Sequence, residues 1–435
     1  MRYQLFGLLT LLLTFNTPAS AVPAIEQAEL DNGLRILLME AHNVPMVSMN
    51  LAIPAGSRFD NKGKGGTAKL LATMLTDHTS RHTHEQWAEM LDRDAIQLGG
   101  SVGRDDMNLS LTVLKDALQP ELDAFAEALL QPGRNKKRFA LKTQNALAGA
   151  QKEQEEPGVQ AAQAAAELLF ANHPYGHRSS GSLTTLQNIE LNDLKKLYQE
   201  QIRPGGAVIA VSGHITMTEL KPMREKLLHD WRDSPAKALT DISPPHAVLG
   251  KQVDVPLPTS QTQLQLLRLG PTRSDTDFFP AFVLNHILGG GGFGSRLMEE
   301  VREKRGLVYG VYSYFSPLAT HGPFVISLST RGDQVDEAET VVRNVLAEMA
   351  AGKITKRQLK ESKENLMGSF AQRMDSNRER VSLIAMIGLY KLPLDYLSVW
   401  TQRVDAVTLQ QLREQAAAYL KPEQWNRVRV GSGLK

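Results

Sequence analysis

The amino-acid sequence predicts a protein of two similar lobes, each built from both strands and helices. Three observations support this prediction. The 435 residues suggest two or three domains, since a domain has about 150 residues. A proline-rich stretch, 234–260, divides the chain near its middle and is typical of a linker, because proline breaks helices and β-ladders. The same order of elements recurs on both sides of it, which indicates a duplicated α/β unit.

The first part, 22–233, opens with a strand at 47–53, where the residue pattern alternates. The elements expected after it are helices at 67–75 and near 84–91, a strand at 107–114 and a helix at 118–130. That last helix carries its apolar residues on one face, namely Leu118, Leu122, Phe125 and Leu129. An alanine-rich helix at 160–170 is expected to pack inside this same half.

The second part, 261–435, repeats this order of elements. The expected elements are a strand at 261–267, helices at 278–288 and 295–304, strands at 308–315 and 323–329, and a helix at 335–349. Strand, helices, strand and helix thus occur twice in the same order.

The composition is that of a soluble globular protein, with 42% hydrophobic and 22% charged residues. The net charge is +2, from 49 basic and 47 acidic residues. This balance argues against nucleic acid or an anionic membrane as a partner.

The N-terminus has the pattern of a secretory signal peptide. Arg2 precedes an apolar stretch at 5–15, and the small residues 19–21 follow. Pro18 ends the apolar stretch well before the roughly 20 residues that a membrane-spanning helix needs. We therefore expect cleavage after Ala21 and a periplasmic protein without stable membrane insertion. There is no cysteine, so neither a lipid anchor on cysteine nor a disulfide is expected.

Several stretches carry a family resemblance. They are 30–35 (LDNGLR), 54–58 (PAGSR), 173–176 (HPYG), 289–297 (GGGGFGSRL) and 302–309 (REKRGLVY). Together they resemble the pitrilysin and mitochondrial-processing-peptidase family of inverted zincins. The resemblance implies an α+β fold with two homologous lobes, each a mainly antiparallel sheet covered by helices. It also implies a half-clamshell, two of which often close around a chamber.

Active members of that family carry H-x-x-E-H on a helix, where two imidazoles hold zinc and the carboxylate acts as the base. In this sequence Lys69 and Thr73 stand at the histidine positions, and Ala72 stands at the position of the base. The third ligand, a glutamate, corresponds to a position near Gly149. A protonated ammonium has no lone pair to donate. The resemblance therefore implies that this chain binds no zinc.

Other histidines are close together in the sequence, above all His78, His82 and His84. His78 and His82 could share a helical face. No carboxylate is suitably placed between them to act as a base, so we interpret these histidines as surface or polar-core residues.

The resemblance assigns a substrate-side role to Arg302 and Tyr309. In the family an arginine and a tyrosine, seven positions apart, donate to the carbonyl oxygen of the scissile bond, where negative charge develops. By periodicity alone, the alternating charges at 299–305 are typical of a solvated helix face. Tyr309 could likewise belong to the core, with the aromatic residues of 312–315.

The glycine run of Gly289, Gly290, Gly291 and Gly292 also has two interpretations. Four glycines could cradle a phosphate, but the Lys-Ser/Thr pair of a P-loop is missing. The resemblance favours a loop that handles substrate, close to the backbone of a peptide.

Two functions follow. The first is the non-catalytic, substrate-binding subunit of a periplasmic heterodimeric zinc endopeptidase, in which a homologous H-x-x-E-H chain holds the zinc. The second is a peptide-binding or scaffold protein of the same fold that takes no part in hydrolysis.

Overall fold

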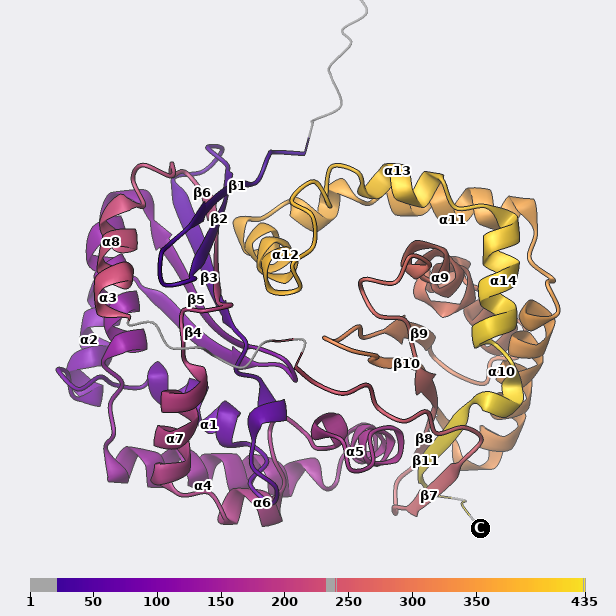
Figure 1. Cartoon of the computed structure of the whole chain (residues 1–435). Coiled ribbons are helices and arrows are strands. Elements are labelled where there is room, and N and C mark those ends of the chain that lie inside the picture. The colour runs from indigo at the N-terminus through magenta and orange to yellow at the C-terminus, as the bar shows by residue number, and fades with distance from the viewer. Residues whose placement is uncertain (1–21, 232–238, 240, 433, 435) are drawn as a thin grey trace, which may run out of the picture.

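The structure, a computed structural model, describes residues 22–231, 239, 241–432 and 434. The expected signal peptide, 1–21, lies outside these residues. The described chain forms two β-sheets with helices on their outer faces (Figure 1). Both sheets are mainly antiparallel, which confirms the predicted α+β fold of two lobes.

The first lobe contains a sheet of six strands in the described part of the chain, in the order β1-β2-β6-β3-β5-β4. The strands are β1 (Glu26–Glu29), β2 (Arg35–Glu40), β3 (Met46–Ile53), β4 (Gln97–Val102), β5 (Met107–Leu114) and β6 (Val208–Gly213). The helices are α1 (Thr67–Leu75), α2 (His84–Arg93), α3 (Leu118–Leu130), α4 (Lys136–Glu153), α5 (Pro157–Leu169), α6 (Leu183–Gln187), α7 (Leu191–Gln201) and α8 (Lys221–Asp230).

The second lobe contains a sheet of five described strands in the order β7-β11-β8-β10-β9. The strands are β7 (Gln252–Pro256), β8 (Gln261–Leu269), β9 (Val311–Phe315), β10 (Pro323–Arg331) and β11 (Asn426–Gly431). The helices are α9 (Phe278–Asn285), α10 (Val335–Ala350), α11 (Lys356–Gly368), α12 (Asn377–Leu389), α13 (Trp400–Asp405) and α14 (Leu409–Tyr419). Strand β7, which pairs in parallel with β11, lies within the stretch 234–260 for which we expected a linker.

Two helices predicted in the second lobe differ from the structure. The helix predicted at 278–288 is α-helical only to Asn285 and continues as a π-helical turn, η4 (His286–Gly290). The helix predicted at 295–304 is largely a second π-helical turn, η6 (Met298–Glu303). The first turn includes Gly289 and Gly290 of the glycine run and the second follows the run, and π-helical turns are frequent at functional sites.

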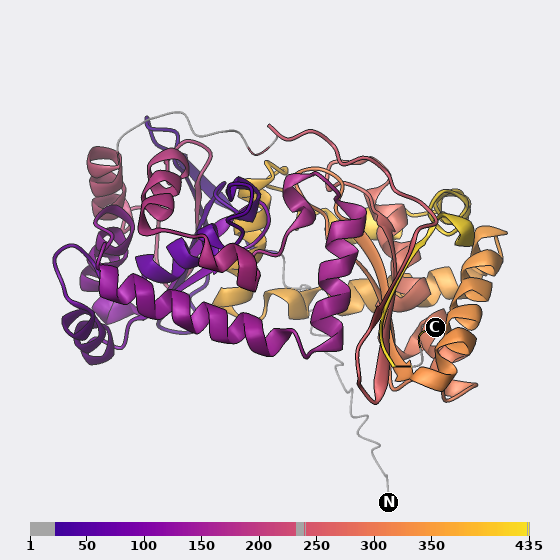
Figure 2. The same cartoon turned by 90° about the horizontal axis from the view of Figure 1, so that it is seen from below.

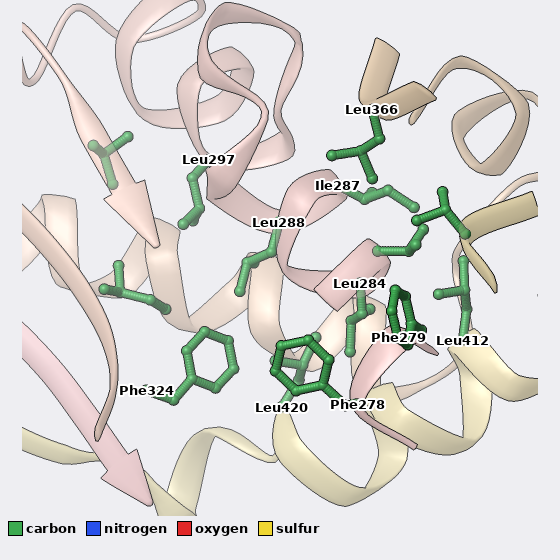
Figure 3. Packing of buried hydrophobic residues seen from close by; sticks show 14 of the residues in the cluster. Phe278, Phe279, Leu284, Ile287, Leu288, Leu297, Phe324, Leu366, Leu412 and Leu420 are labelled. Atoms are coloured by element: carbon green, nitrogen blue, oxygen red, sulfur yellow. The ribbon is translucent and has the colours of Figure 1, made fainter. Parts of the chain in front are cut away.

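The core of the second lobe lies between its sheet and α9, α10 and α14. Figure 3 shows Phe278 and Leu288 directed toward Phe324 of β10, with Leu420 close to Phe278. All four side chains are buried, and full burial of one such side chain contributes about 1.5–3 kcal/mol.

Each lobe contributes one helix to the sheet of the other lobe. Helix α5 packs on β8 and β11 of the second sheet, so the prediction that it packs inside the first half is wrong. Figure 2 shows α4 leading to α5 beside the strands of the second lobe. In return, α12 packs on β2, β3 and β6 of the first sheet. Amphipathic periodicity shows that a helix has a buried face, but not which sheet covers that face.

The close packing of α12 depends on Gly388. A Cβ atom at this position would lie 2.5 Å from a methyl group of Val208 and 2.9 Å from one of Leu37. Any side chain at Gly388 would therefore push α12 away from the first sheet. At its other end, α12 begins with a capping box between Ser376 and Glu379.

Candidate functional site

The helix expected to hold a metal, α1, is well formed. The carboxylate of Asp60 accepts hydrogen bonds from the N–H groups of Gly66 and Ala68, each at 2.8 Å, and so satisfies the start of the helix. The Thr73 hydroxyl donates to the carbonyl of Lys69 at 2.9 Å. Ala72, at the position of the base, is fully buried.

These residues do not fit a zinc ion. Lys69 offers an ammonium, Ala72 a methyl group, and Thr73 a hydroxyl that is already bonded to the backbone. Gly149 lies on an exposed part of α4 and offers no donor. Within the described ranges, no three His, Cys, Asp or Glu side chains gather into a group that could hold a metal ion.

The neighbouring histidines contact two largely buried carboxylates, those of Asp77 and Glu127. Asp77 receives hydrogen bonds from Arg138, at 2.6 and 2.8 Å, and lies 2.7 Å from the Lys142 ammonium. These two cations hold the pKa of Asp77 well below its usual value, although burial acts in the opposite direction. His78 and His84 contact the same carboxylate, at 3.0 and 3.4 Å. His82, the third, lies 2.7 Å from Glu127 instead.

Arg302 and Tyr309 flank a turn that is anchored in the core. The N–H of Leu307 donates to the carbonyl of Val301 at 3.1 Å, and the N–H of Gly306 donates to that of Arg302 at 2.8 Å. Val301 and Leu307 are buried, whereas Tyr309 is 90% exposed. The alternative in which Tyr309 belongs to the core is therefore wrong.

Four exposed aromatic side chains lie on either side of Arg302 along the chain and are here called the aromatic surface: Phe293, Tyr309, Tyr312 and Tyr314. The Arg302 guanidinium lies over the Phe293 ring at 4.9 Å from its centroid. Tyr312 and Tyr314 share one face of β9, because they alternate with the buried Val311 and Ser313. The sequence did not single out Phe293, since only the fold brings its ring to Arg302.

Strand β9 is also an edge of its sheet. An edge strand offers unpaired backbone N–H and C=O groups along one side. An extended peptide can pair with such an edge as an additional strand.

The four glycines have different structural environments. Gly289 is buried, and a Cβ atom there would lie 2.7 Å from both the backbone nitrogen and the hydroxyl oxygen of Ser313 on β9. Gly290 completes η4, and Gly291 packs against His286. Gly292 adopts a φ of +61° with open space around it, a conformation that favours glycine. Close packing thus explains Gly289, whereas Gly292 needs its backbone freedom.

His286, a histidine that no sequence motif singles out, holds this segment in place. His286 of η4 lies 2.9 Å from the Ser362 hydroxyl through Nδ1 and 3.1 Å from the Asn365 side-chain oxygen through Nε2. Burial lowers the pKa of His286. The neutral ring can accept from Ser362 and donate to Asn365, which ties η4 to α11.

A cavity of about 690 Å³, here called the chamber, lies between the first sheet and α12. Its wall on the sheet is polar, whereas the part of the same sheet face that α12 covers is apolar. The chamber is lined by β3, β4, β5 and α12, with Asp106, Arg273 and Tyr390 among its polar residues.

Comparisons with known proteins agree with this geometry. A family model described as "Insulinase (Peptidase family M16)" matches residues 35–178, and one described as "Peptidase M16 inactive domain" matches residues 188–366. A crystal structure of a peptidase M16 inactive domain from Pseudomonas fluorescens has 31% sequence identity and a TM-score of 0.88. It covers 94% of this chain and 97% of its own. The chain belongs to peptidase family M16. The resemblance noted in the sequence is thereby confirmed.

Relatives within family M16 carry different descriptions. A Helicobacter pylori protein described as "Non-peptidase homolog YmxG" is 25% identical over 94% of both chains. A Bacillus subtilis protein described as "Uncharacterized zinc protease YmxG" is 25% identical over 82% of this chain and 86% of its own. The chain itself is an M16 homologue of the inactive type, as its match to the inactive domain indicates.

Proposed function

We propose that this chain is the non-catalytic, substrate-binding subunit of a heterodimeric zinc endopeptidase. A homologous partner with H-x-x-E-H would hold the zinc. This chain would contribute Arg302 and Tyr309 and part of the enclosing wall. The observation that carries the proposal is the contrast between the two lobes: α1 carries no His, Cys, Asp or Glu, whereas Tyr309, which follows the turn after Arg302, is 90% exposed.

The chemistry of the two side chains suits this role. A guanidinium and a phenol both donate hydrogen bonds to an oxygen that gains negative charge. Within the described residues, the Arg302 guanidinium has no carboxylate within 4 Å, whereas Lys304 and Arg305 both pair with Glu300. Arg302 is thus available to a peptide carbonyl without first breaking an ion pair.

The peptide would lie along the β9 edge. Its backbone would pair with the strand, and its side chains would contact the aromatic surface. Stacking on exposed aromatic rings and backbone pairing do not require a particular sequence, so we expect a binding site with broad specificity. In this arrangement Gly290, Gly291 and Gly292 border the bound peptide.

We place this heterodimer in the periplasm, because the sequence begins with the pattern of a signal peptide. The described residues include no helix with the length and apolar character needed to cross a membrane.

The test is to mix the purified mature chain with a homologous H-x-x-E-H chain and measure peptide hydrolysis. We expect hydrolysis only from the mixture. A control partner with its motif glutamate replaced by glutamine should give none. Equal cleavage by the zinc-binding chain alone would refute the proposal.

The second candidate is a peptide-binding or scaffold protein. The one observation that favours it is that Lys69, Ala72 and Thr73 of α1 do not fit a zinc ion. It predicts that a mixture containing Tyr309→Phe cleaves as fast as wild type. The subunit hypothesis predicts slower cleavage, because the hydroxyl donor is lost.

A further inference from the structure

A single buried carboxylate joins the two halves of the molecule. Asp105 lies in the turn between β4 and β5 and is 0% exposed. Its Oδ1 accepts a hydrogen bond from the Tyr175 hydroxyl at 2.5 Å and lies 3.6 Å from the Arg58 guanidinium. Its Oδ2 accepts from the backbone N–H of Ala319 at 2.7 Å and from the Tyr390 hydroxyl at 3.1 Å.

Two of these four partners lie on the side of the first sheet, and two lie on the side of the second sheet. Arg58 belongs to the first lobe, and Tyr390 directly follows α12, which packs on the first sheet. Ala319 lies in the turn between β9 and β10 of the second sheet. Tyr175 follows α5 and packs in the cluster that covers the second sheet. Asp105 therefore receives two partners from the side of each sheet. Figure 1 shows the β4–β5 end of the first sheet close to β9 and β10.

The turn that carries Asp105 is itself held firmly. The backbone carbonyl of Asp105 accepts from the N–H of Gly56 at 3.1 Å, and the N–H of Gly103 donates to the carbonyl of Asp106 at 2.8 Å. A displacement of the second lobe would therefore break bonds to the carboxylate rather than bend the turn. A buried carboxylate is stable only while its oxygens remain hydrogen-bonded, so the contact favours one relative position.

The hydrogen bond between Asp105 and Tyr390 lies at the border of the chamber. Tyr390 and Arg273 line the chamber, and the Arg273 guanidinium lies over the Tyr390 ring at 5.2 Å. Burial and the neighbouring Asp105 raise the pKa of Tyr390, so its hydroxyl keeps the proton that it donates.

We propose that Asp105 is a clasp: its hydrogen bonds to both lobes set the angle between them. The exchanged helices α5 and α12 hold the lobes together, and the clasp selects one angle among those that this packing allows. Removal of the carboxylate then lets the lobes move apart without unfolding. This inference concerns the chain alone and does not depend on a zinc-binding partner.

The absence of cysteine makes a direct test possible. Cysteines introduced at the exposed positions Ser80, in the first lobe, and Asn344, on α10 of the second, can carry spin labels. Double electron–electron resonance then measures the distance between the lobes. We expect one narrow distribution for the parent chain and a shifted or broadened one for Asp105→Ala.

The matched control is Asp106→Asn in the same turn. The Asp106 carboxylate bonds to Asn108 of its own lobe, so we expect the parent distribution. An unchanged distribution in Asp105→Ala, with native circular dichroism, would overturn the proposal and assign the angle to the exchanged helices. If Asp105→Ala does not fold, Tyr390→Phe removes one bond to the clasp and is judged by the same two outcomes.

Discussion

Replacement of Arg302 by alanine should separate a loss of activity from a loss of stability. Among the described residues, this replacement removes the contact with the Phe293 ring, whose centroid lies 4.9 Å from the guanidinium. A cation–π contact at an exposed site contributes about 0.5–1 kcal/mol. For a domain of this size, that corresponds to a decrease of roughly 1–4 °C in melting temperature.

The expected effect on activity is much larger. Removal of one hydrogen-bond donor to the developing charge lowers kcat by about 10²–10³, or roughly 2.7–4 kcal/mol. The assay is kcat/KM for peptide hydrolysis by the mixture with the zinc-binding chain, alongside thermal unfolding of the variant alone.

Arg305→Ala is the matched control, because it removes the same charge three positions away. The Arg305 guanidinium pairs with Glu300 at 2.9 Å and is assigned no role toward substrate. We expect its activity to stay within about twofold of wild type, because Arg305 is not expected to contact substrate, and its stability to fall by about 0–1 kcal/mol, the contribution of an exposed ion pair. Equal losses in both variants, or none in Arg302→Ala, would show that Arg302 has no specific role.

Three further variants test other parts of the account. Phe293→Ala removes the ring that contacts Arg302. The activity of the mixture should fall about 2–5-fold, which corresponds to about 0.5–1 kcal/mol. Full activity would show that the ring is dispensable. Gly388→Val places a methyl group against Val208. Urea unfolding should show that the free energy of unfolding falls by about 1–3 kcal/mol. Unchanged stability would mean that α12 packs less closely than described. Glu121→Gln should stabilise the chain at pH 8 but not at pH 4. Burial raises the pKa of the Glu121 carboxyl to about 7, so the folded state favours the protonated form and loses stability as the pH rises through 7; parallel pH profiles of the two proteins would refute this.

Local sequence patterns predicted the bounds of some elements of the first lobe. Helix α1, strand β5 and helix α3 have the predicted bounds, because their periodicity agrees with what packing requires. The π-helical turns around the glycine run were not predicted, since a charged run such as 299–305 has the same side-chain pattern in an α-helix. Their geometry depends on packing against β9 through Gly289 and Ser313.

Contacts between distant parts of the chain could not be predicted from local patterns. The bond between Asp105 and Ala319 joins residues 214 positions apart, and nothing near either residue indicates it. Helix α5 was assigned to the wrong lobe for the same reason. The lack of metal donors, by contrast, follows from residue identity, since Lys69 and Ala72 cannot supply them in any arrangement.

The most direct test of the central claim is the zinc content of each subunit in the purified complex, determined by native mass spectrometry. We expect one zinc per heterodimer, carried entirely by the H-x-x-E-H chain, and none on this chain when it is purified alone. One zinc bound to this chain would contradict the conclusion drawn from Lys69, Ala72 and Thr73.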